Sequence, residues 1–168
     1  MTNRHLISGK EAKVDGKPAY SSAVVAGNTI FLAGAVSGRD AAGNVIGRGD
    51  IEAQTVAVFE SLEETLASAG ATLADLVKIT VFATKLEYRA KIGEVRARYI
   101  AEPPPASTFV VVTSLADPDF LVEIEGIAVT AYAEVMRADP DAYRGYYQWQ
   151  VYYLTTRGDI LLPVGYGR

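Results

Sequence analysis

The feature that most constrains the fold is an apolar segment late in the chain that carries two carboxylates. Residues 120–129 read FLVEIEGIAV, with Glu123 and Glu125 as the charged side chains. Because side chains alternate between the two faces of a strand, the glutamates share one face and Val122 and Ile124 take the other. The glutamate face is either the solvent side of a one-sided sheet or the lining of a cleft. In a cleft Glu123 is a candidate general base, because burying a carboxylate costs free energy unless it is paired or used.

Composition and charge exclude several function classes. A chain of 168 residues suits one domain with a full core. The net charge of −4 and the lack of a Lys/Arg run argue against a nucleic-acid partner. The chain has no cysteine, which excludes thiol nucleophiles, thiolate metal sites and disulfides. No segment has the apolar length of a membrane span or a secretion signal, so we expect a cytoplasmic protein without a membrane partner.

The first half of the chain predicts two strands and a helix. Short β-prone runs at 22–25 and 29–33 flank the turn triplet 26–28, which predicts a hairpin. The glycine-rich segment 34–49 predicts a long irregular connection. A helix should then run from the N-cap Asp50 to the stop signal Gly70, because apolar positions recur between them at helical spacing.

The second half predicts a strand, a helix and two further strands. Residues 76–83 alternate and are rich in β-branched side chains. A stripe from Tyr88 to Tyr99 predicts a helix that ends before the proline run 103–105. Strands are expected at 108–115 and from 120 to about 135, joined by the turn 116–119. This order predicts an α+β fold with two helices on one face of a mixed sheet, whose other face is covered by self-association.

Several segments, in this order, resemble the Rid family, also called the YjgF or reactive-intermediate-deaminase family. They are Ala19–Val36, Gly43–Thr55, Val58–Leu86, and the motifs PPAST and LVEIEGIA. The resemblance covers about residues 15–132. It implies a chorismate-mutase-like (YjgF-like) fold, a homotrimer, and ligand clefts between subunits. We therefore expect a Rid-like domain over residues 1–132, followed by an extension over residues 133–168.

The resemblance also implies an activity and its residues. Archetypal members hydrolyse imines and enamines to ammonia and a keto acid, without a metal or other cofactor. Glu123 matches the glutamate that orients the attacking water, and Tyr20 and Gly34 match cleft positions. Ser107 and the backbone amide of Phe109 are expected to face the cleft. Tyr20 is equally compatible with a packed position, and Ser107 with a backbone-capping role.

One departure from the family concerns substrate binding. Archetypal members carry an arginine after Pro-Ala that grips the substrate carboxylate, whereas this chain has Ser107 there. Losing such a clamp typically costs roughly 2–5 kcal/mol of binding, because a neutral hydroxyl replaces a charged fork. The family's helical asparagine falls on Gly93. A neutral or differently charged imine fits Ser107 better, unless another arginine substitutes, the candidates being Arg39, Arg48, Arg89 and Arg96.

The predicted extension is a second departure. It holds Trp149, the chain's one tryptophan, and six of its ten tyrosines. Strand-like composition at 146–155 and 160–164, around the turn 156–159, predicts an aromatic hairpin. That hairpin either adds sheet or trimer contact, or forms a wall of the cleft for a flat ligand.

The sequence therefore supports a hydrolase or tautomerase of a small imine, enamine or related carbonyl compound. The alternatives are a trimer that binds a metabolite or acts as a chaperone without catalysis, and a tailoring enzyme of a biosynthetic pathway. A ribonuclease fits the acidic balance poorly. A serine triad would need His5, the chain's one histidine, which lies near the N-terminus.

Overall fold

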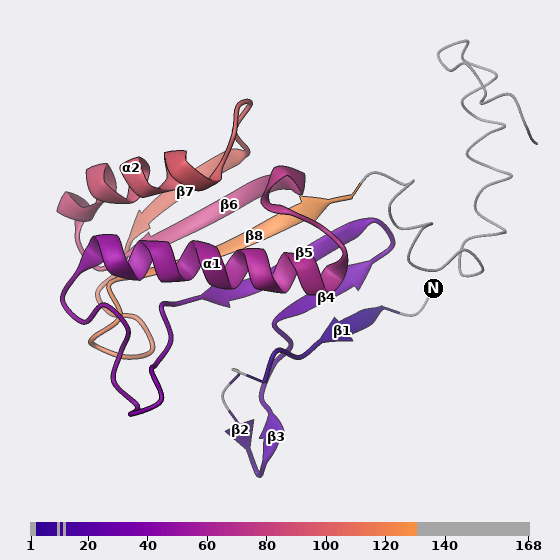
Figure 1. Cartoon of the computed structure of the whole chain (residues 1–168), viewed down its shortest axis with the longest axis horizontal. Helices are drawn as coiled ribbons and strands as arrows, with labels where there is room; N and C mark the ends of the chain where they lie inside the picture. Colours follow the sequence, from indigo (N-terminus) through magenta and orange to yellow (C-terminus); the bar gives the residue numbers. More distant parts are fainter. Residues whose placement is uncertain (1–2, 10, 12, 131–168) are drawn as a thin grey trace, which may run out of the picture. The chain divides into compact units, whose positions relative to one another are not determined.

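The computed structural model describes residues 3–9, 11 and 13–130, which form a mixed sheet with two helices on one face (Figure 1). The order of the six strands is β1-β4-β5-β8-β6-β7. Their bounds are β1 Arg4–Leu6, β4 Ala23–Ala26, β5 Thr29–Ala35, β6 Leu76–Ala83, β7 Ala106–Val111 and β8 Val122–Val129. The helices are α1 Ile51–Ala69 and α2 Arg89–Tyr99, with short 3-10 turns η1 Leu73–Asp75 and η2 Leu86–Tyr88. The predicted α+β class with two helices on one face is confirmed; the predicted extension, residues 133–168, lies outside the described residues.

The strand order differs from the order of the chain at one place. β7 runs parallel to β6 after the crossover through α2, and β8 then lies between β5 and β6, antiparallel to both. The strands on either side of the turn 116–119 are therefore not neighbours, and they span 106–111 and 122–129 in place of the predicted 108–115 and 120 to about 135. β1 and the small hairpin β2 (Lys13–Val14) and β3 (Lys17–Pro18) were not predicted, because two or three residues are too few to show an alternation.

The first helix begins and ends where the sequence predicts. Asp50 Oδ1 accepts hydrogen bonds from the backbone N–H groups of Glu52 (2.9 Å) and Ala53 (3.1 Å). At the other end Gly70 takes the left-handed conformation, with φ of 85°, and its N–H bonds to the Ala67 carbonyl. Such caps satisfy backbone groups that the helix leaves unpaired, and an N-cap contributes about 1 kcal/mol.

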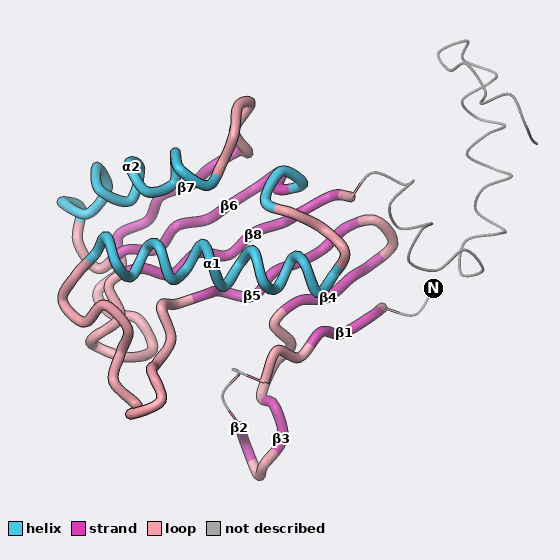
Figure 2. Tube along the Cα trace, viewed as in Figure 1, coloured by secondary structure: helices cyan, strands magenta, loops and turns pink. Residues whose placement is uncertain are grey.

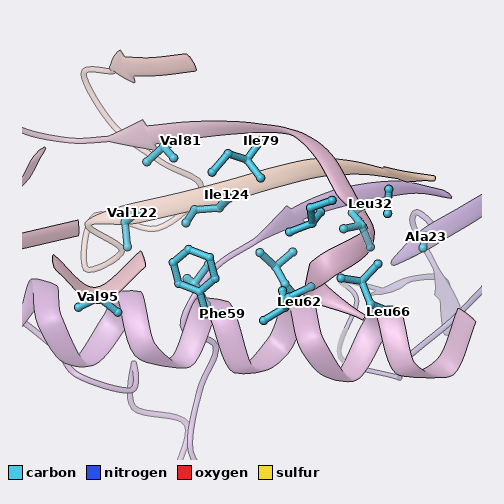
Figure 3. Close-up of a cluster of buried hydrophobic side chains, with 14 of the residues drawn as sticks. Ala23, Leu32, Phe59, Leu62, Leu66, Ile79, Val81, Val95, Val122 and Ile124 are labelled. Carbon is cyan, nitrogen blue, oxygen red and sulfur yellow. The ribbon is translucent and has the colours of Figure 1, made fainter. Parts of the chain in front are cut away.

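The core lies between the helices and the sheet (Figure 3). Leu62 and Leu66 of α1 point toward the strands and belong to one buried cluster with Leu32 of β5 and Ile124 of β8. Phe59 of α1 also stacks on Tyr99 of α2, with ring centroids 5.1 Å apart. Each fully buried side chain of this size contributes about 1.5–3 kcal/mol, so this layer fixes how both helices sit on the sheet.

The opposite face of the sheet is open. In the register of the strands, Phe31 stands beside Ile127, Phe82 beside Glu123, and Val110 beside Phe82. Both helices lie on the other side, so within the described residues no helix covers this face (Figure 1). Phe31 keeps 47% of its surface exposed, and Val110 and Val129 are also exposed. An apolar surface of this kind is typical of a contact with another protein.

Candidate functional site

Glu123 lies near the start of β8, on the open face. Its neighbours Val122 and Ile124 are fully buried in the core, while Glu123 is half-buried and Glu125 is exposed. The alternation predicted from the sequence is therefore confirmed. Phe82 on β6 is the direct partner of Glu123 across the strand pair, so an apolar ring flanks the carboxylate on one side.

A bulge in β5 places Gly34 on the other side of the carboxylate. Leu32 pairs with Gly126 and Ala35 with Ile124, so three steps along β5 oppose two steps along β8. The extra residue turns the Cα–H of Gly34 toward Glu123. A Cβ built on Gly34 would overlap with Glu123 Oε1. Gly34 therefore makes the space that the carboxylate occupies, and a side chain at this position would displace it.

The pKa of Glu123 is raised above the ordinary value for a glutamate. Burial raises the pKa of Glu123, and the nearby charge of Glu125 raises this pKa further. Among the described residues, no hydrogen-bond donor or cation reaches the carboxylate. A half-buried carboxylate with a raised pKa and free oxygen atoms can accept a proton from water or from a ligand, which is the work of a general base.

A buried glutamine of α1 holds the loop that leads into β8. Gln54 is fully buried, and its Nε2 donates to the carbonyls of Asp119 (2.8 Å) and Gly47 (3.2 Å). Its Oε1 accepts from the Leu121 N–H at 2.8 Å. This side chain thus ties the loop before α1 to the loop before β8, two residues ahead of Glu123. The sequence did signal it, because Gln54 is a polar residue on the apolar stripe of the predicted helix.

Two ion pairs join the same loops, residues 36–50 and 112–121, which gather at one end of the sheet (Figure 2). Arg39 pairs with Asp117, and Arg48 Nε lies 3.1 Å from Asp119 Oδ2. The Arg39 guanidinium also lies 5.9 Å above the ring of Phe120. These contacts fix the direction in which the chain enters β8, and sequence spacing gave no sign of them.

Tyr20 lies on the segment before β4. Its neighbour Ser21 bonds through Oγ to His5 Nδ1 at 2.9 Å, and Ser22 donates to Glu11. The Tyr20 side chain is 50% exposed, and no hydrogen bond or ring contact joins it to another described residue. The backbone around Tyr20 is thus held, while half of the Tyr20 surface is exposed.

Ser107 and Phe109 lie on the helix-covered face of β7, opposite Glu123. Their register partners Ile79 and Val81 are both buried in the core. Phe109 packs partly against that core, and Ser107 Oγ accepts a hydrogen bond from Arg96 Nη1 at 3.2 Å. A single chain therefore brings Glu123 and Gly34 together, and it holds Ser107 and Phe109 on the other face of the sheet.

The described residues contain no cluster of three or more His, Asp or Glu side chains arranged to hold a metal ion. In the same part of the chain, neither helix combines the length and the apolar character that crossing a membrane requires.

Comparisons with known proteins agree on one family. A family profile described as Endoribonuclease L-PSP matches residues 11–130. A RutC family protein of Pyrococcus abyssi is 41% identical over 109 residues, which are 65% of this chain and 84% of the relative. A 2-iminobutanoate/2-iminopropanoate deaminase of Dermatophagoides farinae is 31% identical over 129 residues, covering 77% of this chain and 98% of the relative. A crystal structure of a YjgF/YER057c/UK114 family member from Mycobacterium tuberculosis superposes with a TM-score of 0.65 at 32% identity, covering 77% of this chain and all of that one.

Proposed function

Because the chain belongs to the Rid (YjgF) family, we propose that it is a hydrolase of the deaminase type that acts on a small imine or enamine. The observation that carries this proposal is the Glu123 carboxylate, which is half-buried against Gly34, has a raised pKa and accepts no hydrogen bond from another described residue. The deaminase from Dermatophagoides farinae, which is named for two 2-imino acids, supports the reaction class. The ribonuclease in the family's description fits less well with a net charge of −4.

In the proposed reaction, Glu123 accepts a proton from a water molecule as the water oxygen attacks the carbon of a protonated imine. The new C–O bond gives a carbinolamine. Glu123 then returns the proton to the nitrogen. As the C–N bond breaks, Glu123 accepts the hydroxyl proton of the carbinolamine, so that ammonia leaves and a carbonyl compound is the second product; the proton then passes to ammonia or to solvent. No electrons are exchanged with an external group, so the reaction needs only water and a positioned base.

We further propose that the working unit is a homotrimer. The open face carries Phe31, Val110 and Val129, and a second copy of the chain would bury them. Ser107 and Phe109 lie on the face opposite Glu123 in their own protomer. They can meet a Glu123 only if β7 at the sheet edge contacts the open face of a neighbour. Tyr20, half of whose surface is exposed, is assigned to the same intersubunit cleft.

The test is hydrolysis of imines that an amino-acid oxidase generates, followed by ammonia and keto-acid release. Glu123→Gln should lower the rate by about 10²-fold or more, because it removes the base and keeps the shape. Glu125→Gln is the matched control, since it makes the same change two residues along the same face. It should keep its rate and move the acidic limb of the pH–rate profile to lower pH, because the Glu125 charge raises the pKa of Glu123.

The sign of the pH dependence follows from the same shift. A base must be ionised to work, so the rate should fall as pH drops through the pKa of Glu123, which lies above its ordinary value of 4.5. A Glu123→Gln protein with the wild-type rate would contradict the proposal. A protein that binds an imine or the carbonyl product, but never raises the rate of imine hydrolysis above background, would instead be a metabolite-binding trimer.

A further inference from the structure

The open face of the sheet carries a lysine and a glutamate that form no ion pair with any described residue. We infer that Lys78 of one copy pairs with Glu125 of a neighbouring copy, so that assembly sets the charge around the base Glu123. The inference rests on the proposed function, since it concerns the contact between copies that the trimer requires. It goes beyond that function by naming a residue of the neighbour that acts on the site.

Lys78 of β6 lies on the open face, where its register partner on β8 is Ile127. The side chain is half-buried. Its ammonium donates to three neutral oxygens: the carbonyl of Ile79 (2.7 Å), Thr108 Oγ1 (2.9 Å) and Thr80 Oγ1 (3.3 Å). Among the described residues, no carboxylate lies within ion-pair distance of it. The charge of Lys78 is therefore not neutralised within the described chain.

Glu125 of β8 carries the opposite charge. It is exposed, and its register partner is Thr80, so it lies in the row of side chains toward which the Lys78 ammonium points. No cation of the described chain pairs with it. The other acid on this face, Glu123, is half-buried beside Gly34 and is less free to reach a neighbour.

A neighbouring copy that covers the open face must meet both charges. The exposed apolar residues Phe31 and Val129 share this face, and a contact that buries them also takes Lys78 and Glu125 out of water. Removing an unpaired charge from water costs free energy, which an opposite charge at contact distance offsets. Each copy brings one of each charge. In a closed ring, each Lys78 can therefore face the Glu125 of the next copy.

The pair changes the electrostatic surroundings of the base. In the single chain, the charge of Glu125 adds to burial in raising the pKa of Glu123. A cation beside Glu125 opposes this effect and lowers the pKa of Glu123 again. Glu123 is then ionised at lower pH in the assembly than in a separate chain, which makes the base depend on the neighbour.

No other charge of the described strands competes for this role. Beside Glu123, β5 and β7 present Gly34 and Val110, which carry no charge. His5 lies at the sheet edge in β1, with β4 and β5 between it and β8. Arg4 of the same strand donates to Ala69 of α1, on the helix side of the sheet.

The acids of the loop before β8 also have partners of their own. Asp117 pairs with Arg39, and Asp119 pairs with Arg48. Within the described chain, Lys78 and Glu125 are thus the charges of the open face that a neighbouring copy can bring together.

A double-mutant cycle tests the pair, with assembly of the full-length chain measured by sedimentation velocity over a range of concentrations. Lys78→Met and Glu125→Gln should each raise the concentration at which half of the chains assemble by about 10-fold or more, because each leaves a buried charge unpaired. The double variant should lose less than the product of the two effects, since no unpaired charge remains. Lys85→Met is the matched control and should assemble like the wild type, because the Lys85 pair with Glu87 (3.6 Å) is exposed.

The pH profile of imine hydrolysis gives a readout that a purely structural contact would not move. At concentrations where sedimentation shows full assembly, Lys78→Met should shift the acidic limb to higher pH, because the charge of Glu125 is no longer offset. Glu125→Gln should shift it to lower pH. Glu125→Lys changes an exposed position and sets two cations against each other, so it should weaken assembly more than Glu125→Gln does. This arm does not depend on the folding of Lys78→Met.

Wild-type assembly of Glu125→Lys, or additive effects in the cycle, would overturn the pair and leave the role of Glu123 intact. The same cycle in a Phe31→Glu background, which should yield single chains, is followed by urea unfolding. Coupling that persists there would place the pair within one chain and overturn it as a contact between copies. A wild type that sediments as a single chain would overturn the trimer as well. Loss of the effect of Glu123→Gln would overturn the hydrolase proposal alone.

Discussion

At the scale of single residues, the site depends on the fit between Gly34 and Glu123. The carboxylate occupies the volume that a Cβ on residue 34 would fill. The two positions are therefore coupled although they lie far apart in the sequence. Such coupling is measurable, because contacting residues show non-additive effects on stability.

We predict that Gly34→Ala lowers the free energy of unfolding by about 1 kcal/mol, the low end of the cost of overpacking, because the flexible end of the Glu123 side chain can move aside. In a Glu123→Ala background the same substitution should cost much less, because the obstructing carboxylate is gone. Urea unfolding of the wild type, the two single variants and the double variant gives the coupling energy. Additive effects in this cycle would show that the methyl group does not meet the carboxylate.

The sequence predicts the face of the strand on which Glu123 lies, but not the contact between Glu123 and Gly34. Alternation alone places Glu123 and Glu125 on the face opposite Val122 and Ile124, because the period of a strand is fixed. It cannot predict that Gly34 faces Glu123, since that contact needs both the strand order and the bulge in β5. The hydrogen bond from Arg96 to Ser107 cannot be predicted from the sequence either, because it depends on how α2 packs beside β7.

At the scale of elements, Gln54 links α1 to the loops around the site. We predict that Gln54→Leu lowers the free energy of unfolding by about 2–4 kcal/mol, because it leaves the carbonyl of Asp119 and the N–H of Leu121 without their partner. Thr55→Val is the control, since Thr55 is equally buried but its hydroxyl bonds to Ile51 of its own helix. Its cost should be about 1 kcal/mol or less. Equal costs in urea unfolding would contradict the linking role.

Glu11 holds the N-terminal segment to β4. Burial alone raises the pKa of Glu11, but hydrogen bonds from Ser22 and Ser8 outweigh it and lower the pKa to about 2. A lowered pKa in the folded state stabilises the fold above the ordinary value of 4.5, and this stabilisation is lost as pH falls from there toward 2. We predict that Glu11→Gln makes the free energy of unfolding less dependent on pH across this range, measured by urea unfolding. An unchanged slope would show that Glu11 does not anchor the segment.

The ends of α1 are easier to predict from the sequence than the position of β8 in the sheet. The caps Asp50 and Gly70 act through contacts within a few residues, so both ends of α1 are predicted correctly. The place of β8 is decided by pairing with β5 and β6, which come from distant parts of the chain. The predicted turn at 116–119 is present, but a turn alone does not determine which strands pair.

At the scale of the whole molecule, the open face of the sheet is the surface that the proposed trimer would bury. We predict that Phe31→Glu yields single chains in sedimentation velocity, because it puts a charge into an apolar contact. It should also abolish imine hydrolysis by separating Glu123 from the neighbouring β7. Leu86→Glu is the control, since Leu86 is 65% exposed in η2 and lies outside the open face. Wild-type sedimentation of the Phe31→Glu protein would contradict a contact through this face.

The position of β8 between β5 and β6 has a consequence for how the protein is made. Within the described residues, β8 is the strand that joins β1, β4 and β5 to β6 and β7, so this six-stranded sheet cannot be completed before residues 122–129 are synthesised. The same eight residues deliver Glu123. A chain truncated before residue 122 therefore lacks both the strand that connects the two parts of the sheet and the Glu123 carboxylate.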